Sequence, residues 1–172
     1  MPIEIDPIVR NMTAHLEAFR AIYSAMTAEE ARWRPSETEW SSLEILAHLV
    51  DEERDDFRTR VDLTLHRPDE PWPPIDPSGW VITRRYAERD LRETWEEFET
   101  ERARSLAWIA GLEEPDWERS RLHPVAGELR AGDLMASWET HDVLHLRQVV
   151  RVRHRFLVAR REPYSTRYAG EW

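Results

Sequence analysis

The chain has 172 residues, of which 34 are acidic and 24 basic, and its net charge is −10. This negative charge opposes non-specific binding to a phosphate backbone, because that affinity comes from positive side chains that displace counterions, so we expect no nucleic-acid partner. The absence of cysteine excludes disulfides, thiolate ligands and a cysteine nucleophile. Any metal ion would therefore be held by histidine and carboxylate side chains.

Membrane association is not expected either. No apolar run approaches the roughly 20 residues that a membrane-spanning helix needs. The first ten residues, MPIEIDPIVR, have neither the basic leader nor the apolar core of a signal peptide. We therefore expect a soluble, cytoplasmic protein.

The first helix is predicted over about residues 7–26. Asp6 and Pro7 are typical of an N-cap followed by the first helical position, and apolar residues recur at spacings of three and four as far as Met26. Thr27 and Glu30 then have the spacing of a capping box, which predicts a short additional turn of helix.

Ser41 and Glu44 repeat the capping-box spacing, and no helix breaker follows before Pro68, so a second helix is predicted over about 42–65. Residues 66–79 contain five prolines and end in Gly79, which excludes regular helix and a central strand there. This segment is predicted to be a long crossover.

The third helix is predicted over about 82–110 and the fourth over about 131–155, separated by an irregular stretch that begins at Gly111. No segment alternates convincingly between apolar and polar residues. Four long amphipathic helices and one proline-rich crossover predict an all-α four-helix bundle, with residues 1–172 as a single domain and residues 156–172 as a tail.

Two histidines lie on the apolar stripe of the fourth helix, in the segment WETHDVLHLRQ. His141 and His145 are four residues apart, so their rings lie one above the other and can converge on one ion. The alternative is a pair of core histidines whose nitrogens are satisfied by carboxylates or backbone groups. A third histidine nearby would favour the metal.

His48, within EILAHLVDEE of the second helix, is the candidate for that third ligand. Helical periodicity places it opposite the apolar stripe of its helix, on the same side as Asp51 and Glu52. Such a face is either solvated or borders an open cleft of the bundle. In the second case His48 can be a ligand, and Asp51 or Glu52 can hold its other ring nitrogen or transfer protons.

The motifs together resemble a known family. They are AHLVDEE around His48, a glycine–tryptophan pair at Gly79 followed by Tyr86, and GEL..GDL....ETHDVLHLRQ, which ends at Gln148. In order and separation they resemble the DinB-like superfamily, which includes YfiT-type proteins assigned as metal-dependent hydrolases and the bacillithiol and mycothiol S-transferases. The resemblance covers roughly residues 5–155.

The resemblance implies a four-helix bundle, commonly a homodimer, with a divalent ion, usually zinc or nickel, on His48, His141 and His145. It also implies a small-molecule substrate and either a hydrolase or a thiol S-transferase activity. Because the chain has no cysteine, the thiol would come from a low-molecular-weight cofactor such as bacillithiol or mycothiol.

Further candidates surround this triad. Glu52 or Asp51 is a candidate proton shuttle, and a candidate substrate pocket comprises Trp40, Trp80, Trp138 and Arg147. Each has a simpler alternative. The acidic residues, and Asp142 with them, can be solvated charges on a helix face. The tryptophans can be core residues, and the arginine can be an ordinary exposed side chain. A competing function is a non-catalytic metal-binding or stress-response protein in which the metal is structural or acts as a sensor.

Overall fold

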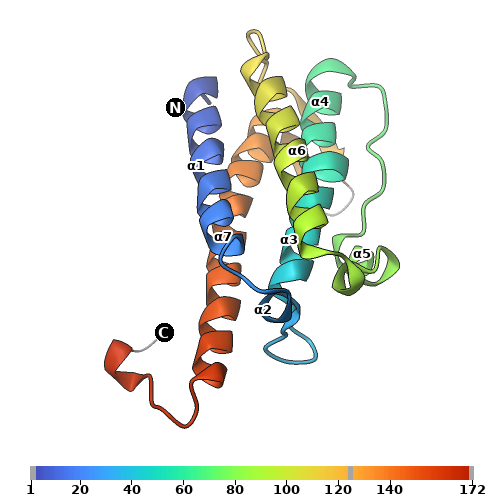
Figure 1. The fold of residues 1–172 in the computed structure, drawn as a ribbon. Helices are drawn as coiled ribbons and strands as arrows, with labels where there is room; N and C mark the ends of the chain where they lie inside the picture. The colour runs from blue at the N-terminus through green and yellow to red at the C-terminus, as the bar shows by residue number, and fades with distance from the viewer. Residues whose placement is uncertain (1–2, 124–125, 171–172) are drawn as a thin grey trace.

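Four long helical segments lie side by side in the computed structural model, which describes residues 3–123 and 126–170 (Figure 1). They are α1 (Ile5–Tyr23), the segment formed by α3 (Ser42–Asp51), η1 (Glu52–Phe57) and α4 (Arg58–His66), then α6 (Leu91–Ala110) and α7 (Ala131–Arg160). The predicted all-α four-helix bundle with a long crossover is thereby confirmed. Among the described residues, no helix is both long enough and apolar enough to cross a membrane.

The predicted helix starts are confirmed where side chains cap the backbone. The Ser41 hydroxyl accepts a hydrogen bond from the Glu44 amide at 3.2 Å, and the Glu44 carboxylate accepts one from the Ser41 amide at 2.8 Å, which completes a capping box at α3. Thr27 caps the short helix α2 (Ala28–Arg32) in the same way. The start of α1 was predicted wrongly, because Glu4 is its N-cap and Asp6 lies in its first turn.

The sequence predicts one continuous α-helix over about 42–65, but the structure interrupts it. Residues Glu52–Phe57 form a π-helical turn, η1, in which hydrogen bonds span five residues in place of four. The extra width changes which side chains share a face after residue 52. Apolar periodicity could not reveal this turn, because five of its six residues are charged.

The crossover leads from α4 back to α3 (Figure 1). It contains a short helix, α5 (Pro77–Thr83), and a single 3₁₀ turn, η2 (Tyr86–Glu88). The third long helix was predicted to begin near residue 82, but it begins at Leu91, where the Asp90 carboxylate caps the amides of the first turn. Arg85 lies between α5 and η2 with a φ of 52°, a left-handed conformation that ends the preceding helix.

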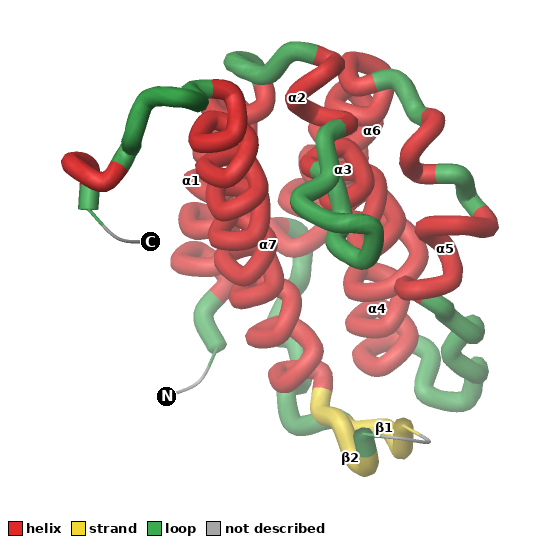
Figure 2. The backbone as a smooth tube through the Cα atoms, turned by 90° about the horizontal axis from the view of Figure 1, so that it is seen from below, coloured by secondary structure: helices red, strands yellow, loops and turns green. Residues whose placement is uncertain are grey.

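A two-stranded hairpin occupies the stretch that was predicted to be irregular. Strands β1 (Ser120–His123) and β2 (Gly127–Arg130) are antiparallel, with Ser120 opposite Arg130. Figure 2 shows this hairpin at the end of the bundle where α7 begins. Each strand has only four residues, too few for apolar alternation to be recognised. At the other end, α7 continues to Arg160, five residues beyond the predicted end, and the 3₁₀ turn η3 (Arg167–Ala169) follows it.

Two large apolar clusters of the bundle are separated by a polar layer, and a smaller one lies between α3 and the crossover. The first includes Phe19, Leu46, Phe98 and Val149, and the second includes Met12, Val61, Ile109 and Met135. Between these clusters, α3, η1, α6 and α7 contribute a layer of buried charged residues and histidines. This layer comprises His48, Glu52, Glu53, Arg102, Asp142 and His145.

Candidate metal centre

Three histidines from two helices meet in the polar layer. His48 comes from α3, and His141 and His145 come from α7. Each offers one ring nitrogen, and these three nitrogens lie within 4.8 Å of one another. The Nε2 atoms of His141 and His145 are 3.1 Å apart. The structure therefore brings together the three residues that the sequence nominated.

This spacing fits a divalent ion. With zinc–nitrogen bonds of about 2.0–2.1 Å, two ligands at a tetrahedral angle lie roughly 3.4 Å apart. The His141–His145 pair is close to that separation. The remaining separations, which are at most 4.8 Å, require side-chain adjustments on the order of 1 Å for all three nitrogens to reach one ion.

Gln148 fixes the orientation of the His145 ring. The amide oxygen of Gln148 lies 2.8 Å from His145 Nδ1, so this nitrogen carries the proton and donates it to the amide. The lone pair of the ring is then on Nε2, which faces His141. Metal-ligating histidines commonly donate a hydrogen bond from the ring nitrogen that does not bind the metal, and this hydrogen bond selects the ligating tautomer.

His48 is buried, with 5% of its surface exposed, although helical periodicity placed it on a face that looked solvated. All residues of α3 from Ser42 to Asp51 are buried. The face opposite the bundle core is covered by α2, α5 and η2, segments that the periodicity of one helix cannot take into account. The Trp40 ring also packs against His48, with ring centroids 5.1 Å apart.

Glu52 lies beside the outer nitrogen of His48. The Glu52 Oε1 atom is 3.6 Å from His48 Nδ1, too far for a hydrogen bond, and among the described residues neither atom has a hydrogen-bond partner. A carboxylate in this position is the usual partner of a metal-ligating histidine. Burial, and then repulsion by the Asp56 carboxylate, raise the pKa of Glu52 to about 9.

The three imidazoles are neutral at neutral pH. Burial lowers the pKa of His48 to about 2 and that of His141 to about 3, and the neighbouring histidines add to the effect. Burial also lowers the pKa of His145, in part offset by the hydrogen bond with Gln148. Only a neutral imidazole can bind a metal, so the unprotonated triad is in its ligating form.

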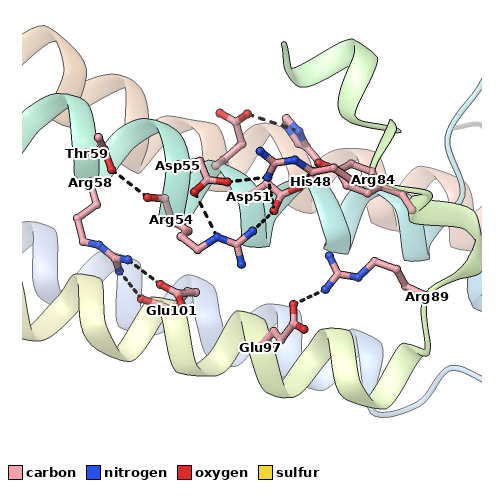
Figure 3. A network of polar contacts seen from close by, with 12 residues as sticks. His48, Asp51, Arg54, Asp55, Arg58, Thr59, Arg84, Arg89, Glu97 and Glu101 are labelled. Atoms are coloured by element: carbon pink, nitrogen blue, oxygen red, sulfur yellow. Dashed lines mark hydrogen bonds and ion pairs between the residues drawn. The ribbon is translucent and has the colours of Figure 1, made fainter. Parts of the chain in front are cut away.

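Asp51 belongs to a network that holds the crossover. Its carboxylate accepts hydrogen bonds from the Tyr86 hydroxyl and from Arg54, both at 2.5 Å, and pairs with Arg84 at 2.8 Å (Figure 3). The Arg84 guanidinium also lies 3.8 Å from the centre of the Trp80 ring. Asp51 therefore ties α3 to residues 84–86, whereas Glu52 is the carboxylate that approaches the triad.

The four candidate pocket residues occupy different environments. Trp40 alone among them packs directly on a triad ring. Trp80 is buried with Ala47 and Tyr86, and Trp138 is buried and stacks on Phe57 at 5.9 Å. The phenyl ring of Phe57 in turn contacts His141, at 5.1 Å between centroids. Arg147 is exposed and lines a surface hollow of about 470 Å³ together with Leu144, Gln148 and Arg151.

A buried ion-pair cluster beside the triad was not predicted from the sequence. Arg102, which is fully buried, binds both oxygens of Asp142 and the Oε1 atom of Glu53. His15 Nδ1 also contacts Asp142, at 3.1 Å. Asp142 is therefore buried and paired, and the alternative that it is a solvated charge on a helix face is wrong. A signal was present in the sequence, because Arg102 continues the inward stripe of Phe98, Ser105 and Ile109 on α6.

Comparisons with known proteins agree with this architecture. The model of the DinB superfamily matches residues 11–149, and a search of curated proteins finds no match. Among solved structures, YfiT from Bacillus subtilis, described as a probable metal-dependent hydrolase with an unusual four-helix bundle topology, superposes with a TM-score of 0.77. The two chains are 15% identical over 91% of this chain and 93% of YfiT, which shows a shared fold. Since the family model matches most of its length, this chain belongs to the DinB superfamily.

Proposed function

We propose that this protein is a divalent-metal-dependent enzyme of the hydrolase or thiol S-transferase type, with its ion on His48, His141 and His145. The observation that carries the proposal is the buried, unprotonated triad, whose ring nitrogens lie within 4.8 Å of one another. The description of YfiT as a probable metal-dependent hydrolase supports the same class of chemistry.

Three imidazole ligands leave a divalent ion with open positions for water or a substrate, and zinc or nickel is the ion that the family resemblance favours. When bound, such an ion can lower the pKa of a bound water to about 7, or hold a thiol as its thiolate. Because the chain lacks cysteine, that thiol would be a small molecule such as bacillithiol or mycothiol.

The surrounding residues have separate tasks in this proposal. Gln148 holds His145 in its ligating tautomer. The Glu52 side chain accepts a hydrogen bond from the Nδ1–H group of His48 once the two groups approach. Trp40 and Phe57 form apolar walls against the triad rings. Such walls exclude bulk water and strengthen the electrostatic interactions within the site.

A second candidate is a non-catalytic protein in which the ion is structural or acts as a sensor. The burial of the triad favours it, because His48 and His145 are only 5% and 6% exposed. His141 is half-buried and provides the accessible side of the centre. Turnover therefore separates the two candidates better than metal content does.

The test is a turnover screen on zinc-loaded and nickel-loaded protein. Activated esters report hydrolysis, and bacillithiol or mycothiol with an electrophile reports thiol transfer. We expect turnover that a chelator abolishes and that His141→Ala removes, while the exposed His66→Ala variant retains it. If no thiol or ester gave chelator-sensitive turnover, the non-catalytic candidate would replace the metal-dependent enzyme.

The homodimer implied by the family resemblance remains a prediction. One face of α7 exposes four large apolar side chains, Val143, Leu144, Val150 and Leu157, whose exposed fractions range from 37% to 53%. A second subunit that covers this face would remove them from water. Light scattering of the wild type and of Val143→Glu tests this, and a wild-type monomer at micromolar concentration contradicts it.

A further inference from the structure

Away from the triad, two neighbouring N–H groups are buried, and neither has an acceptor among the residues that the structure describes. They are the indole Nε1 of Trp72, in the crossover, and the guanidinium Nη1 of Arg121, on β1. The Arg121 guanidinium lies 5.2 Å from the centre of the Trp72 ring, so the two groups are neighbours. A buried donor without an acceptor costs about 1–3 kcal/mol, and two such donors side by side call for an acceptor.

The charges around these donors favour an anion as that acceptor. Arg60, on α4, also contacts the Trp72 ring, at 4.8 Å, but it forms an ion pair with Asp56 and that pair is neutral. Arg121 forms no ion pair with an acidic side chain among the described residues, and its other terminal nitrogen donates to the Glu70 carbonyl. The Glu70 carboxylate pairs with Arg67 instead. One positive charge is therefore left over beside the two free N–H groups.

Three segments that are distant in sequence meet at this point. Trp72 belongs to the crossover, Arg60 to α4 and Arg121 to the hairpin, and the ring of His123 lies 5.9 Å from that of Trp72. Arg60 follows His48 by twelve residues, or roughly 18 Å along a helix axis. The contact between Trp72, Arg60 and Arg121 is thus separate from the triad, and a ligand bound there would not require the proposed function.

We propose that Trp72 and Arg121 form a binding site for a small oxyanion, a carboxylate or a phosphate group of a small molecule, beside the neutral Arg60–Asp56 pair. The two N–H groups donate to the oxygens of the anion, and the Arg121 guanidinium balances its charge. Both donor nitrogens are buried. The anion joins the crossover to the hairpin at this point.

Indole NMR signals test this site directly. The chain has nine tryptophans, and the signal that disappears in Trp72→Phe identifies the Nε1–H of Trp72. Metal-free protein is titrated at pH 7 and constant ionic strength with sodium phosphate, sodium succinate or sodium chloride. We expect the Trp72 signal to move saturably with phosphate, succinate or both, and not with chloride. The responding anion distinguishes a phosphate from a carboxylate ligand.

Matched variants make the result specific. Arg121→Gln is expected to weaken the response at least tenfold, whereas Arg92→Gln, on the exposed side of α6, leaves it unchanged. Arg121→Lys keeps the positive charge and replaces Arg121→Gln in the experiment if the latter does not fold. In Arg121→Lys, we expect the Trp72 signal to respond to the anion more weakly than in the wild type. His141→Ala leaves the response intact, so loss of metal and loss of anion binding are scored separately. The proposal is overturned if neither oxyanion gives a saturable response, or if the response is the same without Arg121.

Discussion

Arg102 donates hydrogen bonds to both carboxylate oxygens of Asp142, at 2.6 and 2.7 Å, and Asp142 immediately follows a triad histidine. Neither side chain is more than 1% exposed. The same guanidinium holds Glu53, which also accepts a hydrogen bond from the Trp138 indole at 2.9 Å. One arginine thus pairs with two carboxylates in the middle of the bundle and ties α6 to η1 and α7.

Removal of this arginine is expected to be strongly destabilising. Arg102→Met leaves Glu53 and Asp142 buried without their cation, which costs about 3–5 kcal/mol in the free energy of unfolding. Arg104→Met is the matched control, because Arg104 is exposed and its ion pair with Glu101 contributes less than about 1 kcal/mol. Urea unfolding of both variants measures the difference. Equal stability losses in the two variants would contradict the account of the cluster.

Gln148 is expected to matter for metal affinity and little for the fold. Gln148→Leu removes the acceptor that fixes the tautomer of His145, and loss of such an outer contact typically lowers metal affinity 10–100-fold. Competition with a fluorescent zinc chelator measures this change. Arg147→Leu, at the adjacent exposed position, should bind the ion like the wild type. If Gln148→Leu also kept wild-type affinity, the outer contact would have no role in holding the ion.

Much of this site could be predicted from sequence, but the surroundings of His48 could not. His141 and His145 lie on a clear apolar stripe, so their inward direction follows from one helix alone. The burial of His48 depends on α2, α5 and η2, which cover the other side of α3. Helical periodicity describes one helix at a time, so it left open whether this face was solvated or bordered a cleft of the bundle.

The same limit explains the other differences. The π-helical turn and the hairpin are local backbone features with no apolar signature, since the turn is charged and each strand has four residues. The four long helices were predictable because capping boxes and apolar stripes are local signals. The Arg102 cluster required knowing which charges from three helices meet, and that is a tertiary property.

Tyr86 is expected to hold the crossover against α3. Tyr86→Phe deletes the hydrogen bond from its buried hydroxyl to Asp51, and a hydrogen bond to a charged group contributes about 1.5–3 kcal/mol. Thermal or urea unfolding detects a loss of this size. Tyr164→Phe, at an exposed position in the C-terminal tail, should change stability by less than about 0.5 kcal/mol. A Tyr86→Phe protein as stable as the wild type would show that Arg84 and Arg54 suffice to hold Asp51.

The triad also predicts how stability depends on pH in metal-free protein. The pKa of His141 is about 3 when folded and 6.5 when unfolded, so below pH 6.5 the unfolded chain binds a proton that the folded chain does not. The free energy of unfolding therefore decreases as the pH falls from 6.5 toward 3, by up to about 1.4 kcal/mol per pH unit for each such histidine. Glu52, with its raised pKa, acts in the opposite direction between pH 4.5 and 9.

A difference between variants isolates the histidine contribution from that of Glu52. His141→Gln removes one titrating group, so its stability should decrease less steeply than that of the wild type between pH 6 and pH 4.5. Urea unfolding in the presence of a chelator at several pH values provides both slopes. Parallel curves for the two proteins would mean that His141 is not held in its neutral form by burial.

The central claim is that His48, His141 and His145 hold one divalent ion, and metal stoichiometry tests it most directly. Purified protein is equilibrated with zinc or nickel, dialysed, and analysed by mass spectrometry for metal per chain, in parallel with single alanine variants of each histidine. We expect one ion per wild-type chain and a loss of that ion in all three variants, with His66→Ala unchanged. A wild type that retains no ion, or triad variants that retain as much as the wild type, would contradict the account.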